Sequence, residues 1–411
     1  MKNNLDKLVD AILDWDATQM ANFLILHALN VWASDIHIEP WEAMIRIRIR
    51  IDWVLHLVSE YQVSLHDAFI ARLKIMSKLQ TDEKRIPQDW VINTTLENWW
   101  EVDLRVSTLP TVNWEKVCMR VQDKTKEIPT FKDMWIRASW LANLNNAIQK
   151  PNWIVLVTWP TWSWKTTTLY SALSLLNQDW VNIMTVEDPV EIKMPWLNQC
   201  QVNEKIWYDF PKALRAALRQ DPNIIMLWEI RDKETVEIAL RAAMTWHLVL
   251  STIHTNSAVS TINRLLDMWV KPFLIAWTIN AIQAQRLVRR VCSHCIERYT
   301  PDQHIIDDIK KELKWLPDSE WLDIAQLDSL VLSRWAWCEH CNNTWFKWRM
   351  WIYEVLEIDR EIEEMIVSWA WELEITKKAK EKWFTTMLQD WIIKAIAWYT
   401  TIEEIFNIVN D

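Results

Sequence analysis

The first part of the chain alternates between two spacings of apolar residues. Apolar side chains recur at helical spacing from about residue 5 to residue 31, which predicts one or two amphipathic helices. Strand-like alternation is seen over 35–39, 43–52 and 91–121, with a helical pattern over 64–80. We therefore expect a small α+β domain over residues 1–122.

A different pattern begins after residue 150. Short apolar runs alternate with helical segments, which is typical of a parallel sheet covered on both faces. The runs are 154–158, 183–186, 224–227 and 248–252. The pattern predicts a polar linker over 123–140, an α/β core over 141–285 and, over 286–411, a mostly helical region with a cysteine-bearing insertion.

The composition argues against reading every residue literally. The chain has 411 residues, 33 tryptophans and no glycine, whereas average usage predicts roughly 29 glycines at this length. Turns, helix ends and phosphate-binding loops need backbone conformations that only glycine adopts at little cost. We hypothesise that tryptophan stands where the protein has glycine, because a codon that is a stop in most genomes is translated as glycine in its source. Individual positions can still be genuine tryptophan.

Charge and apolar length restrict the class of protein further. The 45 basic and 55 acidic residues give a net charge of −10, which disfavours nonspecific nucleic-acid binding as the main activity. The first residues show no secretory signal, and no apolar run approaches the roughly 18 residues of a membrane-spanning helix. We expect a cytoplasmic protein that spans no membrane.

The segment 153–168, WIVLVTWPTWSWKTTT, carries a phosphate-loop pattern. With three tryptophans taken as glycine it contains GPTGSGKT, between a buried strand and a helix. Backbone N–H groups of such a loop bind phosphate oxygens, Lys165 adds a positive charge, and Thr166 can ligate Mg²⁺. An indole at position 164 would fill the phosphate site. The predicted nucleotide-binding residues are Trp159, Pro160, Thr161, Trp162, Ser163, Trp164, Lys165, Thr166 and Thr167.

Acidic and histidine side chains follow the later apolar runs. Glu187 and Glu229 each end a predicted strand, and the carboxyl ends of parallel strands gather beside the phosphate loop. Both are candidates to activate water or hold Mg²⁺; a solvated acid at a strand end is the alternative. His247 and His254 flank the run 248–252 and are candidates to sense the γ-phosphate, or else packing residues.

Four of the six cysteines form two C-x₂-C pairs. Cys292 and Cys295 make the first pair, and Cys338 and Cys341 make the second, with 42 residues between the pairs. Two such pairs are typical of a tetrahedral Cys₄ zinc site. Redox disulfides are the alternative, which a reducing cytoplasm disfavours.

Two groups of three arginines stand out. One lies on the predicted strand 43–52, where alternation places the three on one face while isoleucines enter the core. Such a face either binds an anion or is a solvated strand edge. The other group precedes the first cysteine pair, where we expect a solvated helix face, with binding of a partner as the alternative. The groups are Arg46, Arg48 and Arg50, and Arg286, Arg289 and Arg290.

Eight stretches closely resemble the secretion ATPase family, the hexameric motors of type II secretion and type IV pilus assembly. They are ASDIHIEP (33–40), EKRIPQDW (83–90), DLRVSTLPT (103–111), the phosphate loop, TVEDPVE (185–191), LRAALRQDPNIIMLWEIRD (214–232), TWHLVLSTIHTN (245–256) and QRLVRRVC (285–292). The resemblance covers nearly the whole chain. Tryptophan stands where these motors have glycine at Trp53, Trp90, Trp114, Trp162, Trp164, Trp228, Trp246 and Trp269.

The resemblance implies a fold and roles for residues. It implies a RecA-like P-loop core that uses ATP and Mg²⁺. Glu187 corresponds to the Asp box and is predicted to be the general base. Glu229 corresponds to the Walker B carboxylate and would hold Mg²⁺ with Thr166, while His247 and His254 correspond to the His box.

Two further expectations follow from the same family. Arginines of its N-terminal domain approach the nucleotide across the gap between domains or subunits, which makes Arg48 and Arg50 candidate γ-phosphate sensors. The zinc site resembles that of assembly and secretion motors and is lacking in retraction motors.

The predicted function is therefore that of an ATP-hydrolysing homo-hexamer powering pilus assembly or type II secretion. It would act at the inner face of the cytoplasmic membrane on a platform protein, with no specific nucleic acid. The chain begins near the family's second domain, which puts docking through an extra N-terminal domain in doubt. Alternatives are a pilus-retraction motor, a DNA-uptake or DNA-translocating P-loop ATPase, or an inactive scaffold if the tryptophans are literal.

Overall fold

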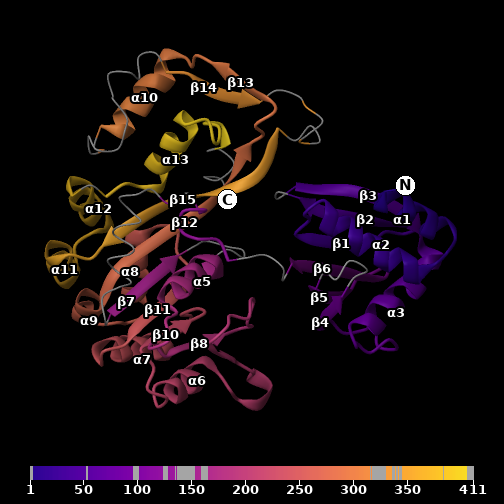
Figure 1. Ribbon diagram of the computed structural model, residues 1–411, viewed down its shortest axis with the longest axis horizontal. Coiled ribbons are helices and arrows are strands. Elements are labelled where there is room, and N and C mark those ends of the chain that lie inside the picture. The colour runs from indigo at the N-terminus through magenta and orange to yellow at the C-terminus, as the bar shows by residue number, and fades with distance from the viewer. Residues whose placement is uncertain are drawn as a thin grey trace. The chain divides into compact units, whose positions relative to one another are not determined.

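The computed structural model divides the chain into two compact units, Met1–Glu127 and Ile128–Asp411 (Figure 1). The boundary between them lies inside the stretch 123–140 that was expected to be a linker. The residues that the structure describes are 3–51, 54–95, 101–123, 128–134, 136, 153–158, 165–314, 316, 330–335, 338, 341, 345–382 and 384–404.

The N-terminal unit is an antiparallel sheet with helices packed on one face. The strand order is β3-β2-β1-β6-β5-β4, and side chains from all three helices join one face of the sheet in a single apolar core. The elements are α1 (Asn4–Leu13), α2 (Ala17–Asn30), β1 (Asp35–Pro40), β2 (Met44–Ile51), β3 (Val54–Gln62), α3 (His66–Met76), β4 (Gln88–Thr95), β5 (Glu101–Pro110) and β6 (Glu115–Asp123). The expected α+β character is confirmed.

The second unit contains a seven-stranded sheet in the order β15-β12-β7-β11-β10-β8-β9. All neighbours are parallel except β12 and β15. The elements are β7 (Trp153–Thr158), α5 (Lys165–Leu176), β8 (Ile183–Glu187), β9 (Asn198–Gln201), α6 (Phe210–Ala217), β10 (Ile224–Leu227), α7 (Lys233–Met244), β11 (Leu248–Ile253), α8 (Ala258–Asp267), α9 (Pro272–Thr278), β12 (Ile279–Val291), β15 (Phe346–Glu357), α11 (Arg360–Val367) and α12 (Glu372–Glu381).

Helices cover both faces of this sheet (Figure 1). On one face, Tyr170 of α5 joins a core that includes Val155 and Val157 of β7. On the other face, helices α6 to α9 pack in a core that includes Ile154 and Leu156. Because successive residues of β7 face opposite cores, the strand reads as a continuous apolar run, as the sequence predicted.

The region after residue 285 differs from the prediction. Strand β12 continues through the expected boundary at 285/286 as far as Val291, because β15 pairs with it residue by residue from Ala281 to Arg289. The prediction that the arginines in this stretch lie on a solvated helix face was wrong. They are Arg286, Arg289 and Arg290, and Arg289 donates hydrogen bonds of 2.7 and 2.6 Å to Glu404.

The rest of the C-terminal region contains helices, as expected, together with short strands. The elements are β13 (Ile296–Tyr299), α10 (Gln303–Leu313), β14 (Leu332–Trp335) and α13 (Met387–Ile396). Among the described helices of the chain, none is both long and apolar enough to cross a bilayer.

Tryptophan occupies most of the left-handed backbone positions. Of the thirteen described residues with positive φ, eleven are tryptophan. They are Trp15, Trp32, Trp153, Trp196, Trp207, Trp246, Trp269, Trp345, Trp348, Trp369 and Trp398. A bulky side chain is an outlier at such positions, whereas glycine is the usual residue there.

Candidate functional site

The frame of a phosphate loop is present in the second unit. Strand β7 ends at Thr158 and helix α5 begins at Lys165, as the motif requires. The connecting residues 159–164, and the side chains of Lys165 and Thr166, lie outside the described part of the chain. Of the predicted nucleotide-binding residues, the side chain of Thr167 is described, and it is nearly buried.

The carboxyl ends of four parallel strands lie at one edge of the sheet, where β7 leads into the phosphate-loop segment. The register aligns Thr158 of β7 with Ile253 of β11, and it aligns Leu227 of β10 with both Ser251 of β11 and Val186 of β8. Glu187 is the last residue of β8, and Glu229 and His254 follow β10 and β11. The structure therefore brings all three to one edge of the sheet, as parallel topology predicts.

Glu229 is the centre of a cluster of charged and polar side chains at this edge, the Glu229 cluster. Its carboxylate is nearly buried, and Oε1 lies 2.9 Å from His254 Nε2. Oε2 accepts a hydrogen bond of 3.1 Å from Arg231 Nε, while Arg231 also approaches Asp188 at 4.0 Å. Arg231 and His254, which follow β10 and β11, thus contact one carboxylate, and Asp188 after β8 joins the cluster through Arg231. Carboxylate oxygens are ligands that Mg²⁺ prefers.

Glu187 is enclosed in a different environment. Its side chain is completely buried, and it accepts hydrogen bonds from Tyr170 Oη (2.5 Å), Thr185 Oγ1 (2.5 Å) and Gln199 Nε2 (3.1 Å). Burial raises the pKa of Glu187, although these hydrogen bonds oppose the shift. In this arrangement the carboxylate faces helix α5 and strand β9 and is closed to solvent.

His247 lies on the opposite side of the same sheet, at the amino end of β11. Its carbonyl accepts a hydrogen bond from the N–H of Trp153, the first residue of β7, and its ring contacts Ala242 O at 2.9 Å. The six residues of β11 separate it from His254, which corresponds to about 20 Å at the usual rise of a strand. Within one chain, the structure brings His254 to the cluster and does not bring His247 there.

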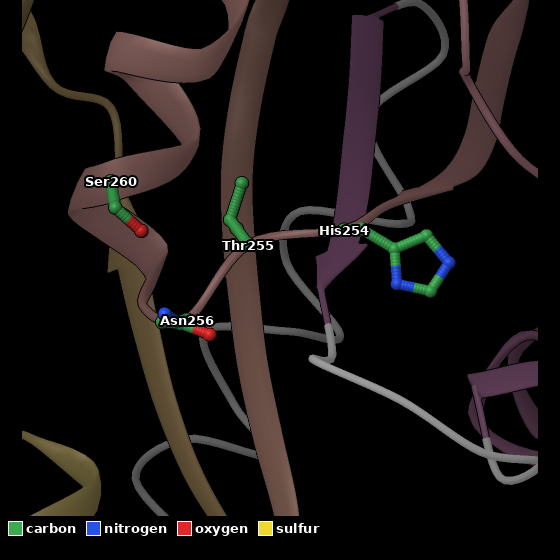
Figure 2. Close-up of a pocket in the computed structure, with 4 residues that line it drawn as sticks. All are labelled: His254, Thr255, Asn256 and Ser260. Atoms are coloured by element: carbon green, nitrogen blue, oxygen red, sulfur yellow. The ribbon is translucent and has the colours of Figure 1, made fainter. Parts of the chain in front are cut away.

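A pocket lies beside His254, lined by His254, Thr255, Asn256 and Ser260 (Figure 2). Thr255 also fixes the end of β7, because its N–H donates a hydrogen bond of 2.9 Å to Thr158 Oγ1. The end of β7, where the phosphate-loop segment begins, is therefore hydrogen-bonded to the residue that follows His254.

The arginines of β2 lie on one face of the N-terminal sheet, as predicted, and carry carboxylate partners there. Arg48 donates a hydrogen bond of 2.6 Å to Glu39, and Arg50 lies 3.5 Å from Asp35. Both side chains remain about one third exposed.

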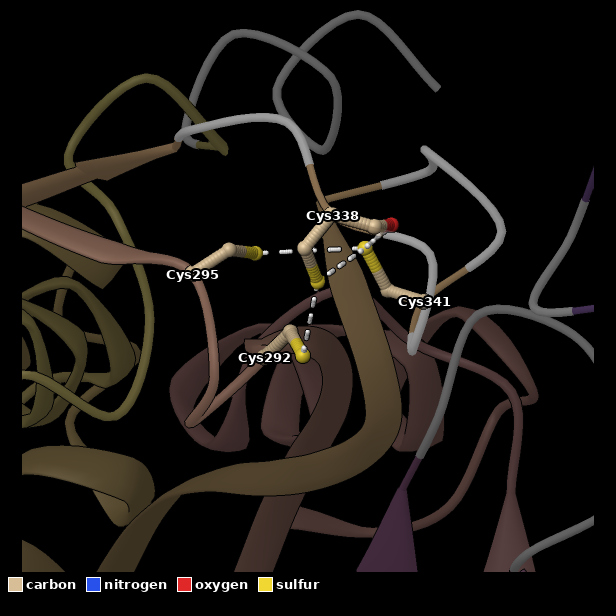
Figure 3. A group of neighbouring side chains, drawn as sticks. All are labelled: Cys292, Cys295, Cys338 and Cys341. Atoms are coloured by element: carbon tan, nitrogen blue, oxygen red, sulfur yellow. Dashed lines mark hydrogen bonds between the residues drawn. The ribbon is translucent and has the colours of Figure 1, made fainter.

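The four paired cysteines converge in space (Figure 3). Their sulfur atoms all lie within 4.8 Å of one another, with separations of 3.9 Å for Cys292–Cys338, 3.9 Å for Cys295–Cys341 and 3.4 Å for Cys338–Cys341. A disulfide needs about 2.05 Å between sulfurs, whereas four thiolates at about 2.3 Å from a tetrahedral zinc lie about 3.8 Å apart. The arrangement fits a zinc ion.

Sequence reasoning missed several residues of the site. Arg231 and Asp188 join the Glu229 cluster, and Tyr170 encloses Glu187. Asp188 and Arg231 were within reach of the sequence, because each lies within two positions of a predicted carboxylate. Tyr170 gave no such signal, since an aromatic residue in a helix usually belongs to the core.

Comparisons with known proteins agree with this fold and with the phosphate-loop sequence. A match to the family described as "Type II/IV secretion system protein" spans residues 16–407. The chain is 39% identical over 402 residues to the type IV pilus assembly ATPase PilB of Myxococcus xanthus, covering 98% of this chain and 69% of that protein. It is 40% identical over 422 residues to the type II secretion system protein HxcR of Pseudomonas aeruginosa, covering 99% and 82%.

A solved structure shares the architecture. The Legionella pneumophila ATPase DotB matches with a TM-score of 0.68 over 96% of both chains, at 20% sequence identity. At that identity the likeness concerns the fold alone. It agrees with the small N-terminal unit followed by a larger α/β unit.

Proposed function

Because the chain belongs to the family of type II/IV secretion system proteins, we propose that it hydrolyses ATP as a homo-hexameric motor for type IV pilus assembly or type II secretion. The observation that carries the proposal is the Glu229 cluster. It lies at the edge of the parallel sheet where β7 leads into a phosphate-loop sequence.

Nucleotide binding is assigned to the segment 159–167. Its backbone N–H groups and Lys165 would hold the phosphates at the start of α5. Thr166 and Glu229 would hold Mg²⁺, which neutralises charge on the phosphates when bound. The donor set supports this assignment, because Glu229 is a nearly buried carboxylate that Arg231 and His254 hold in one orientation.

The two carboxylates are assigned different roles. Glu229, with His254 beside it, faces the edge where the γ-phosphate would lie, so His254 can report the state of that group. The general-base role of Glu187 requires that Tyr170 or Gln199 move away, because these donors close the carboxylate to water. Opening of this enclosure when nucleotide binds would make hydrolysis dependent on the conformation of α5.

The cysteine cluster supports assembly or secretion over retraction. Cys292 directly follows β12 and Cys295 precedes β13, so a zinc ion held by the four thiolates would join these two strands to the segment 338–341. Two of the relatives named above are a pilus assembly ATPase and a secretion protein. We propose a location at the inner face of the cytoplasmic membrane, on a platform protein of the machine.

ATP hydrolysis by purified chain carrying glycine at the 33 tryptophan positions tests the proposal. We expect Lys165→Ala to lose ATP binding, because the positive charge on the phosphates is removed. Glu187→Gln is expected to retain binding and to lower turnover by roughly 10²- to 10⁴-fold, the usual loss for a general base. Glu229→Gln is expected to weaken the dependence on Mg²⁺.

Glu237→Gln is the matched control, since Glu237 pairs only with Lys233 on the surface of α7 among the interactions described. No ATP hydrolysis by the glycine-bearing chain would refute the proposed function. Normal turnover in Glu187→Gln would leave Glu187 with a structural role alone.

A further inference from the structure

Two glutamines lie buried in the sheet beside the phosphate-loop strand. Gln283 and Gln285 belong to β12, share one face of it, and are both fully buried. The register places Gln283 opposite Val157 and Ala284 opposite Thr158, at the point where β7 ends. Their face is the one that α5 covers, because Val157 and Ala281 pack with Tyr170 there.

Gln285 connects this strand to the first turn of α5. Thr168 Oγ1 donates a hydrogen bond of 2.8 Å to Gln285 Oε1, and Gln283 Nε2 donates one of 2.9 Å to the same oxygen. Thr168 is three residues after Lys165 in the helix and is 2% exposed. The helix turn that carries the nucleotide-binding residues is therefore fixed to β12 by side-chain hydrogen bonds.

Packing alone does not account for these amides. Gln283 Oε1 is buried and has no hydrogen-bond partner among the described residues. A buried polar atom without a partner destabilises the fold, and leucine or methionine would fill the same space without that penalty. The amides are thus maintained at a cost in stability, directly beneath the start of α5.

We propose that Gln285, oriented by Gln283, is a positioning residue that sets the first turn of α5 for nucleotide binding. The proposal rests on the proposed function. The hydrogen bond to Thr168 fixes the position and rotation of this helix turn relative to the end of β7, where the phosphate loop begins. Small displacements of groups that bind phosphate weaken binding strongly, because the site is organised before the ligand arrives.

The test compares variants of the full-length, glycine-bearing chain. Thr168→Val and Gln285→Met remove the hydrogen bond and keep the volume. Each is expected to weaken affinity for Mg²⁺-ADP by roughly fivefold to thirtyfold, as loss of a buried hydrogen bond allows. The double variant should show less than the product of the two effects, because both remove one interaction. Thr168→Ser should restore affinity to within about twofold.

Thr278→Val is the control, because Thr278 is also 2% exposed and its hydroxyl donates only to Leu274 O among the interactions described. Melting temperature is measured for every variant, and Gln283→Met replaces any variant that does not fold. Wild-type ADP affinity in Thr168→Val and Gln285→Met, with a fall in melting temperature like that of the control, would overturn the inference. A parent chain that binds ADP no better than Lys165→Ala would overturn the proposed function, and this inference with it.

Discussion

At the scale of single residues, the helix ends explain the unusual composition. The N–H of Trp15 bonds to Ile12 O, and the next N–H bonds to Ala11 O. This pair of hydrogen bonds is the Schellman motif, in which the left-handed residue is usually glycine because a Cβ is unfavourable there. The same pair follows α2, α8, α11 and α13, at Trp32, Trp269, Trp369 and Trp398. Five helices therefore end in the same motif, and in each of them tryptophan occupies the position that usually requires glycine. This supports the hypothesis that tryptophan stands for glycine.

Intact mass of the protein purified from its own cells tests this hypothesis. Each replacement of tryptophan by glycine removes about 129 Da, because the whole indole side chain is lost. We expect a mass about 4.3 kDa below the 49.4 kDa of the printed sequence if every position is affected. Peptide mapping then identifies any genuine tryptophan. A mass that matches the printed sequence would contradict the hypothesis.

At the scale of elements, an ion pair between Glu39 of β1 and Arg48 of β2 stabilises the N-terminal sheet. Burial raises the pKa of Glu39, but hydrogen bonds and charges from Arg48 and Lys116 outweigh it and lower the pKa to about 2. The folded state therefore binds a proton at Glu39 less readily than the unfolded state does. Stability from this group is present above about pH 4.5 and is lost as the pH falls towards about 2.

Glu39→Gln is expected to lower the free energy of unfolding at pH 7 by only about 1 kcal/mol, because the partner cations are partly exposed and solvent screens the ion pairs. It should also flatten the decline of stability between pH 4.5 and pH 2. Urea unfolding at pH 7 and pH 3 measures both effects, with Glu42→Gln as the control on an exposed neighbour. An unchanged acid dependence would mean that other carboxylates determine it.

The cysteine cluster is the second feature at this scale. A zinc ion there would hold the end of β12 to β13 and to the segment at Cys338 and Cys341. We expect one zinc per chain by metal analysis, released when Cys292→Ser removes a ligand, with local loss of structure because metal binding and folding are coupled. Cys200→Ser is the control, because Cys200 lies outside the cluster. A metal-free protein with four reactive thiols in the folded state would contradict this expectation.

At the scale of the whole molecule, the family resemblance predicts that Arg48 and Arg50 act on the γ-phosphate of the nucleotide. Arg48 and Arg50 belong to the N-terminal unit, whereas Lys165 and Glu229 belong to the second unit. If the arginines contact the γ-phosphate, they act on ATP and its hydrolysis, while Lys165 governs binding of either nucleotide. Their ion pairs with Glu39 and Asp35 would then be exchanged for contacts with phosphate during the cycle.

We therefore expect Arg48→Ala combined with Arg50→Ala to leave ADP affinity nearly unchanged. ATP affinity and turnover should both fall, and an arginine acting on a transition state can contribute roughly 10³- to 10⁵-fold. Arg46→Ala is the control, because Arg46 lies on the same face and pairs with Glu60. Wild-type turnover and affinities in the double variant would show that Arg48 and Arg50 have only a structural role in the sheet.

The sequence alone determined the local elements and the side of the sheet at which the candidate carboxylates lie. The alternation over 45–51 defined β2 and its charged face, and short apolar runs located β7, β8, β10 and β11, because strand periodicity and burial on both faces are local signals. Since the carboxyl ends of parallel strands lie together, the sequence also placed Glu187 and Glu229 there.

Only the tertiary structure decided what depends on partners distant in sequence. Residues 286–291 form a strand because β15, more than 50 positions away, pairs with them. His247 and His254 fall at opposite edges because a strand lies between them, although both adjoin it in sequence. Glu187 is closed by Tyr170 and Gln199, whose approach follows from the packing of α5 and β9 on β8. Such contacts are set by the packing of whole elements, which no spacing of residues along the chain records.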